Sequence, residues 1–170
     1  MPEQPCFDLN QINNRSLVHL RVRPDDADAI SKVLKLPPVL RCLTEDPKIH
    51  WLGPDHWLFA SDTKTAKDII DHIDMTLSDQ LYAAMDMSSS TACFSLEGPA
   101  ARRVLSMGCG LDLHPGAFIS GHCTRTHFAN VTLFIVALEG EKFNLYVDRS
   151  LARYLRDWLH IAAEDPITRV

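Results

Sequence analysis

The fold of this chain is decided by three linked stretches: FSLEGPAARRVLSMGCGLDLHPGAF at residues 94–118, GHCTRTHFANVTLFIV at 121–136 and FNLYVDRSLARYLRDWL at 143–159. The first stretch opens with apolar residues at every second position, the pattern of a half-buried strand. Gly98-Pro99 then begins a helix, because proline suits the first helical turn, and Gly108 ends it. The inward-facing residues of this helix are predicted to be Ala101, Val104 and Leu105.

The other two stretches predict three more strands and a final helix. Two strands cover residues 124–128 and 131–138, and a turn at 139–141 leads to a third strand from Phe143 to Val147. Ser150 is expected to cap the last helix. The apolar face of that helix is formed by Leu151, Tyr154, Leu155, Trp158 and Leu159. We expect Trp158 to pack in the core of the chain, with a role as an interface anchor on another protein as the alternative.

Residues 16–75 repeat this order of elements. Val18, Leu20 and Val22 alternate in a strand, and Pro24 opens a helix. Residues 49–52 and 57–60 form a hairpin around a Gly-Pro-Asp turn, so we interpret WLGPDHW at 51–57 as aromatic packing rather than a ligand-stacking box. Ser61 or Asp62 is expected to cap the next helix. The apolar face of that helix is formed by Ala66, Ile69, Ile70 and Ile73.

The predicted fold class is therefore α+β, with two pseudo-repeated β-α-β-β-α halves at about 16–75 and 91–163. We expect residues 16–170 to form a single domain and residues 1–15 to form an irregular N-terminal arm. The segment from Met75 to Ser90 joins the halves. Whether LYAAMDMS at residues 81–88 is a helix or an added strand is left open.

Composition excludes several classes of function. The net charge of −5 and the scattered basic residues argue against nucleic-acid binding, and the adjacent Arg102 and Arg103 are explained by an exposed helix face. The longest apolar run, residues 131–138, is too short to span a membrane, which takes about 20 residues. The N-terminus lacks a secretion signal and the five cysteines are odd in number. We therefore expect a cytoplasmic protein.

Motifs for cofactors and metals fail on spacing. Gly108-Cys109-Gly110 begins a dinucleotide fingerprint, but Leu113 stands where the third glycine is required, and a helix rather than a strand precedes it. A zinc site would have to combine His114, His122, Cys123 and His127. Their spacing matches no zinc knuckle, so surface or strand-edge histidines are the preferred interpretation.

Motifs for catalysis are equally incomplete. Ser88, Ser89 and Ser90 lack a nucleophile elbow and are interpreted as linker. Cys109 follows a helix C-terminus, whose negative end is expected to raise the pKa of its thiol. The sequence offers no reason to bring together the remaining acid–base candidates, Glu97, Asp112, Asp148 and His114. Asp112 and Arg125 are expected to be structural, as an ion pair if both are partly buried.

Four segments in register resemble one known family, the gamma subunit of heterotetrameric sarcosine oxidase. They are WLGPDHWL at 51–58, Leu96 to Leu105, the loop and strand from Leu111 to Thr126, and the last helix from Arg149 to Leu159. Together they cover roughly two-thirds of the chain, whereas residues 1–45 match poorly. The resemblance implies a fold like the folate-binding domain of aminomethyltransferases.

The resemblance also implies a role for the chain. The complex would demethylate sarcosine to glycine, produce hydrogen peroxide and pass the one-carbon unit to tetrahydrofolate. This chain would assemble with alpha, beta and delta subunits and contribute no catalytic, cofactor-binding or metal-binding residue. FAD, FMN, NAD and tetrahydrofolate would lie on other subunits, and zinc on the smallest. The alternatives are a subunit of a related N-methyl amino acid dehydrogenase, a free-standing folate-dependent enzyme or folate-binding protein of the same fold, and a metal-binding module.

Overall fold

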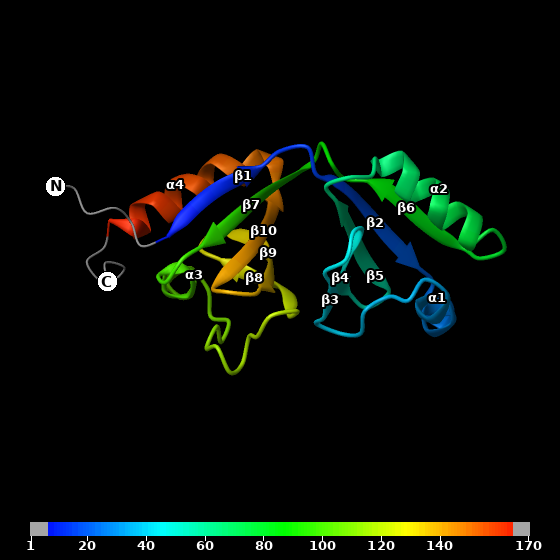
Figure 1. The fold of residues 1–170 in the computed structure, drawn as a ribbon, viewed down its shortest axis with the longest axis horizontal. Coiled ribbons are helices and arrows are strands. Elements are labelled where there is room, and N and C mark those ends of the chain that lie inside the picture. The colour runs from blue at the N-terminus through cyan, green and yellow to red at the C-terminus, as the bar shows by residue number, and fades with distance from the viewer. Residues whose placement is uncertain (1–6, 165–170) are drawn as a thin grey trace. The chain divides into compact units, whose positions relative to one another are not determined.

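The computed structural model describes residues 7–164, which form two compact units. Unit 1 contains residues 7–12 and 92–164, and unit 2 contains residues 13–91. Each unit has its own five-stranded antiparallel sheet and its own helices (Figure 1). The sequence predicts one domain made of two halves, and the structure places those halves in separate compact units.

Unit 2 is built on a sheet of order β3-β4-β5-β2-β6. Its elements in chain order are β2 (Ser16–Val22), η1 (Pro24–Asp26), α1 (Ala27–Val33), β3 (Cys42–Leu43), β4 (Lys48–Gly53), β5 (His56–Ser61), α2 (Ala66–Thr76) and β6 (Tyr82–Asp86). The core forms between the sheet and the helices, because β2 contributes Val18 and Leu20 while α2 contributes Ile69 and Ile73. The predicted hairpin and the apolar face of α2 are confirmed.

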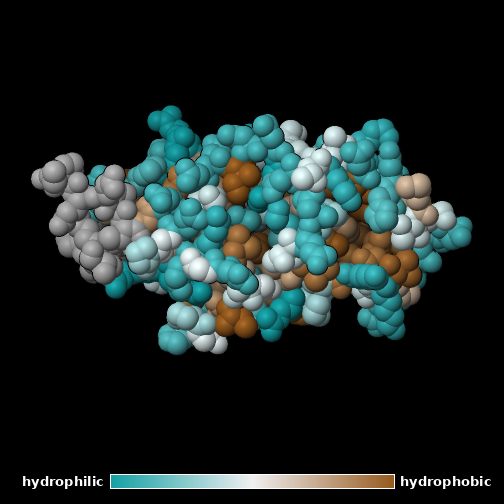
Figure 2. All heavy atoms as spheres, viewed as in Figure 1, coloured by the Kyte–Doolittle hydropathy of each residue, from teal (hydrophilic) through white to brown (hydrophobic). Residues whose placement is uncertain are grey.

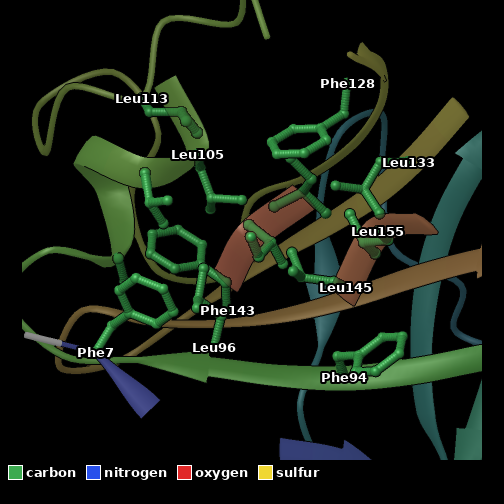
Figure 3. Close-up of a cluster of buried hydrophobic side chains, with 14 of the residues drawn as sticks. Phe7, Phe94, Leu96, Leu105, Leu113, Phe128, Leu133, Phe143, Leu145 and Leu155 are labelled. Carbon is green, nitrogen blue, oxygen red and sulfur yellow. The ribbon is translucent and has the colours of Figure 1, made fainter. Parts of the chain in front are cut away.

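Unit 1 is built on a sheet of order β1-β7-β10-β9-β8. Its elements are β1 (Asp8–Ile12), β7 (Thr91–Glu97), α3 (Ala101–Gly108), β8 (Cys123–Phe128), β9 (Val131–Leu138), β10 (Lys142–Asp148), η2 (Arg149–Leu151) and α4 (Ala152–Ala163). Figure 3 shows side chains of these strands and helices meeting in one cluster, with Leu105 of α3 and Leu155 of α4 among them. The α+β class is confirmed.

Each half has the order β-α-β-β-β-α, one strand more than the predicted β-α-β-β-α repeat. In unit 1 all three strands after the first helix agree with strands that the sequence predicts individually, so only the repeat pattern is wrong there. In unit 2 the extra strand is the two-residue β3, which is too short to show any periodicity. In unit 1 the three strands β8, β9 and β10 all follow α3. The two halves therefore repeat the same order of elements, as predicted, with three strands between the helices of each half.

The edge strands of the two sheets correct the prediction for the N-terminal arm. Residues 8–12 are not irregular: they form β1, which pairs antiparallel with β7. The segment LYAAMDMS contains β6, which pairs with β2, so the choice between helix and strand is decided for strand. Residues 1–6 of the predicted arm lie outside the described residues. The unit 1 sheet is thus completed by β1, which precedes unit 2 in the chain, and the unit 2 sheet is completed by β6, its last strand in the chain.

Two predicted helix caps are corrected. Thr65, rather than Ser61 or Asp62, caps α2, and it exchanges hydrogen bonds with Asp68 in a capping box. Asp148, rather than Ser150, caps the start of the last helical segment, and its carboxylate accepts a hydrogen bond from the Ser150 N–H at 2.9 Å. A turn precedes α2, and the 3₁₀ segment η2 precedes α4. Neither can be recognised from the spacing of apolar residues, so both predicted caps are misplaced.

The final helix buries a narrower face than predicted. Leu155 and Leu159 are fully buried, whereas Leu151 and Tyr154 are exposed. Trp158 is half-buried and packs against the unit 1 core, with its ring edge-to-face to Phe128 at a centroid distance of 4.6 Å. Trp158 therefore packs at the margin of the unit 1 core, with part of its side chain exposed.

Gly108, the last residue of α3, is required by the packing of Phe128. A Cβ at position 108 would lie 2.5 Å from the Phe128 ring, and this ring is fully buried. Such overpacking costs about 1–3 kcal/mol, against a helix-propensity gain of at most about 1 kcal/mol. We predict that Gly108→Ala destabilises the chain by up to about 2 kcal/mol in urea unfolding.

Gly110 provides a matched control two residues along the same segment. A Cβ at position 110 would meet no heavy atom within 4 Å. Gly110→Ala should therefore leave the free energy of unfolding within about 0.5 kcal/mol of the original chain. Equal midpoints for the two variants would contradict the packing argument.

Candidate functional site

Arg102 on α3 organises the loop between α3 and β8, where several of the sequence candidates lie. Its Nε lies 2.8 and 2.7 Å from the two carboxylate oxygens of Glu141. Its Nη1 donates to the carbonyls of Leu113 at 2.7 Å and Phe118 at 2.9 Å. The guanidinium also lies over the Phe143 ring, 5.1 Å from the centroid. The side chain is only 15% exposed, so its interpretation as part of an exposed helix face is wrong.

A surface hollow of about 320 Å³ lies between α3 and this loop. It is lined by Arg102, Arg103, Ser106, Leu111, Asp112, Leu113, His114 and Pro115. The polar groups along it organise the loop: Asp112 accepts from the His114 N–H at 2.9 Å, and His114 Nδ1 accepts from the Gly116 N–H at 3.1 Å. The Ser106 hydroxyl in the same lining donates to the Arg103 carbonyl at 2.7 Å, so it too makes a local backbone contact.

The expected ion pair between Asp112 and Arg125 does not form among the described residues. Arg125 is exposed on β8, and the Asp112 carboxylate bonds the backbone of its own loop. The buried arginine of this region is Arg102 instead. Sequence reasoning missed it because one helical turn carries two adjacent arginines, and only the tertiary fold decides which of them turns inward.

The other acid–base candidates serve separate structural contacts. Glu97 pairs with Lys142 on the neighbouring strand at 2.7 Å. Asp148 caps the final helical segment, and its two hydrogen bonds with Ser150 hold its pKa below the usual range. The structure does not gather these groups with His114.

The four candidate metal ligands are likewise dispersed. Cys123 is buried at the start of β8 and His127 is exposed near its end. Four residues along a strand separate their Cα atoms by roughly 13 Å, too far for both side chains to reach one zinc ion. The His122 ring contacts Phe118 edge-to-face at 5.9 Å. Within residues 7–164 no group of three or more His, Cys, Asp or Glu side chains could hold a metal ion.

The thiols and hydroxyls are not activated as nucleophiles. Burial raises the pKa of Cys109, as predicted in direction, and raises that of Cys42 to about 11. Both thiols therefore stay protonated at neutral pH. Ser88 Oγ accepts from the Leu17 N–H at 2.9 Å and donates to Asp86 at 2.6 Å. The serine run thus fixes the turn between β6 and β7.

The tryptophan-rich hairpin packs as predicted and has a further role. Trp57 is buried, and its indole Nε1 donates to the Pro37 carbonyl at 3.2 Å. The backbone N–H of Trp51 donates to the Arg41 carbonyl at 3.0 Å. The hairpin therefore holds the segment between α1 and β3 at its middle, Pro37, and at its end, Arg41.

A polar cluster in unit 2 was not anticipated from the sequence. Arg15 makes two hydrogen bonds to the Asp62 carboxylate, at 2.7 and 3.0 Å, and Lys48 bonds the same carboxylate at 2.6 Å. Asp46 accepts from the Ser61 hydroxyl at 2.7 Å and from the Asp62 N–H at 3.1 Å. Arg15 and Lys48 lower the pKa of Asp62 to about 2. These residues are far apart in sequence and each looks like an ordinary surface residue, so no local pattern marks them.

Comparisons with known proteins agree on one family. A family model described as sarcosine oxidase, gamma subunit family matches residues 23–165. The chain is 29% identical over 109 residues to the sarcosine oxidase subunit gamma of Corynebacterium sp. (strain U-96), a match that covers 64% of this chain and 52% of that protein. The chain thus spans about half the length of the curated relatives it matches.

Two solved structures share the fold. Heterotetrameric sarcosine oxidase from Corynebacterium sp. U-96 matches with a TM-score of 0.82 at 22% identity, over 95% of this chain and 86% of that one. Aminomethyltransferase T of the glycine cleavage system from Bartonella henselae matches with a TM-score of 0.70 at 14% identity, over 95% and 50% of the two chains. The predicted likeness to the aminomethyltransferase fold is confirmed. None of the helices in residues 7–164 is long and apolar enough to cross a membrane.

Replacing Arg102 should destabilise unit 1. Arg102→Ala leaves the Leu113 and Phe118 carbonyls without their charged donor, so we predict a loss of about 2–4 kcal/mol in urea unfolding. Arg102→Lys should recover only part of this, because a lysine lacks the planar fork that reaches three acceptors. The exposed neighbour Arg103 supplies the control. The free energy of unfolding of Arg103→Ala should stay within about 0.5 kcal/mol of that of the original chain. Similar losses for both alanine variants would contradict an organising role for Arg102.

The Asp62 cluster should make stability depend on pH in the acid range. The pKa of Asp62 in the folded chain is about 2, below the value of about 3.9 expected in the unfolded chain. Its contribution is therefore present above pH 4 and lost as the pH falls toward 2. Because the carboxylate is 43% exposed, screening limits this contribution to about 1 kcal/mol.

Urea unfolding of the original chain and of Asp62→Asn between pH 5 and 2 measures this contribution. The stability difference between them should shrink across that range. Asp157→Asn removes an exposed carboxylate of α4 and controls for the loss of one negative charge. A difference that stays constant down to pH 2 would disprove the assignment.

Proposed function

Because the chain belongs to the sarcosine oxidase, gamma subunit family, we propose that it is the gamma subunit of a heterotetrameric sarcosine oxidase-type complex. The complex oxidatively demethylates sarcosine to glycine, produces hydrogen peroxide and transfers the one-carbon unit to tetrahydrofolate. The observation that carries this proposal is the family match, which extends over residues 23–165 and includes both units.

The proposed role of this chain is assembly rather than chemistry. The titratable groups considered as candidates each support the local fold: Asp112 bonds its own loop, Glu97 pairs with Lys142, and Asp148 caps a helix. Cys42 and Cys109 have raised pKa values, as expected for inert structural thiols. These contacts and pKa shifts support the proposal that the chain has no catalytic residues and affects the reaction only through its partners.

The cofactors belong to the rest of the complex in this proposal. FAD, FMN and NAD lie on the larger subunits with tetrahydrofolate, and zinc on the smallest, while this chain assembles with alpha, beta and delta subunits. The compartment is proposed to be the cytoplasm, and the unbridged thiols of Cys42 and Cys109 suit a reducing environment. The N-methyl amino acid is proposed to be sarcosine, with N-methylglutamate as the substrate of the related dehydrogenases.

Co-expression with the other subunits tests the proposal. The tagged chain should recover the alpha, beta and delta subunits of its source organism in equal amounts, with visible flavin absorbance in the complex. The chain purified alone should be colourless and should produce no peroxide from sarcosine. Turnover of N-methylglutamate instead of sarcosine would revise the substrate. Recovery of a lone monomer that binds tetrahydrofolate would support a free-standing folate protein and contradict the proposal.

A further inference from the structure

The segment between α1 and β3 exposes large aliphatic side chains on a backbone that is held in place. Val33, Val39, Leu40 and Leu43 are 60%, 62%, 44% and 39% exposed. Figure 2 shows hydrophobic residues, in brown, gathered at the surface over the α1 end of unit 2. Single exposed aliphatic residues are common in soluble proteins. A group of them within eleven residues calls for a more specific explanation.

Two of the exposed residues, Val39 and Leu40, belong to a closed and anchored turn. The Arg41 N–H donates to the Pro38 carbonyl at 3.1 Å, which closes a turn with Val39 and Leu40 at its tip. The base is fixed by the buried Trp57 indole, which donates to the Pro37 carbonyl, and by the Trp51 N–H, which donates to the Arg41 carbonyl. An anchored surface of this kind binds a partner without the entropy cost of ordering a loop.

Leu40 occupies an unfavourable backbone conformation at the tip. Its φ is +61°, and a turn with a positive φ at its third position favours glycine. A leucine there is strained, and 44% of it stays exposed to solvent, so the isolated chain recovers only part of the burial that a leucine can provide. The strain is explained if the side chain contributes to binding.

The charges along the segment indicate what it binds. Residues 29–44 contain Lys32, Lys35 and Arg41 and no acidic residue, in a chain whose net charge is −5. Lys32 and Lys35 are exposed. An apolar tip within a basic surround complements an apolar recess rimmed by carboxylates.

We propose that the turn Pro38–Arg41 is a docking element that inserts Val39 and Leu40 into an acidic-rimmed apolar recess on a larger subunit of the complex. This inference rests on the proposed function and extends it by naming the contact surface. In this proposal the tryptophan hairpin holds the docking turn in its binding conformation.

Leu40→Gly separates docking from folding, because the two roles predict opposite effects. Glycine relieves the backbone strain, so the melting temperature of the isolated chain should be unchanged or higher. Binding to the co-expressed alpha, beta and delta subunits should weaken about 10-fold or more, as expected for the loss of an interface anchor. Met75→Gln, which changes a side chain that is 75% exposed on α2, should alter neither property.

Charge reversal provides an independent readout. Lys32→Glu/Lys35→Glu should slow association, and added salt should weaken binding of the original chain more than binding of this variant. Normal assembly of both the Leu40→Gly and the charge-reversed chains would overturn the docking proposal while leaving the proposed function intact. Failure of the original chain to bind these subunits would overturn both.

Two further outcomes would overturn the docking proposal alone. A lower melting temperature of the isolated Leu40→Gly chain would show that Leu40 stabilises the fold. Concentration-dependent dimerisation of the original chain in analytical ultracentrifugation, abolished by Leu40→Gly, would identify a second copy of this chain as the occupant.

Discussion

The structure depends on two antiparallel strand pairings, β1 with β7 and β6 with β2. In chain order β1 precedes β2 but completes the sheet that contains β7, whereas β6 follows α2 and completes the sheet that contains β2. The edge-side backbone hydrogen bonds of β7 and β2 are therefore satisfied by segments outside the predicted repeats. As a consequence, residues 13–91 contain all the strands of the unit 2 sheet, whereas the unit 1 sheet needs β1 from before that segment, and a chain that began after β6 would leave β7 unpaired on one side.

A second principle recurs in both halves. The long connection that follows the first helix lacks periodic structure, and side-chain donors fix it by reaching its backbone carbonyls. In unit 1, Arg102 bonds the carbonyls of Leu113 and Phe118. In unit 2, the Trp57 indole bonds the carbonyl of Pro37. Arg102 lies on α3 and Trp57 lies on β5. In each unit a side chain of a regular element therefore fixes the conformation of a loop.

Several carboxylates of the chain make structural contacts within the two units. Asp62 pairs with Arg15 and Lys48, whereas Asp112 and Asp148 bond the backbone of a loop and the start of a helical segment. These carboxylates therefore act as structural groups of the two units.

The sequence by itself determined those features that depend on local patterns. Alternation located β2, β7 and β10, helical spacing located α2 and α3, and Gly53-Pro54-Asp55 marked the hairpin. The same patterns could not reveal β1 or β3, because the first is a mostly polar edge strand and the second has only two residues. Only the tertiary structure decided which strand completes which sheet, that Arg102 rather than Arg103 turns inward, and that Asp62 gathers Arg15 and Lys48. Each of these is a contact between residues distant in sequence, whose energy depends on burial and geometry that no local pattern encodes.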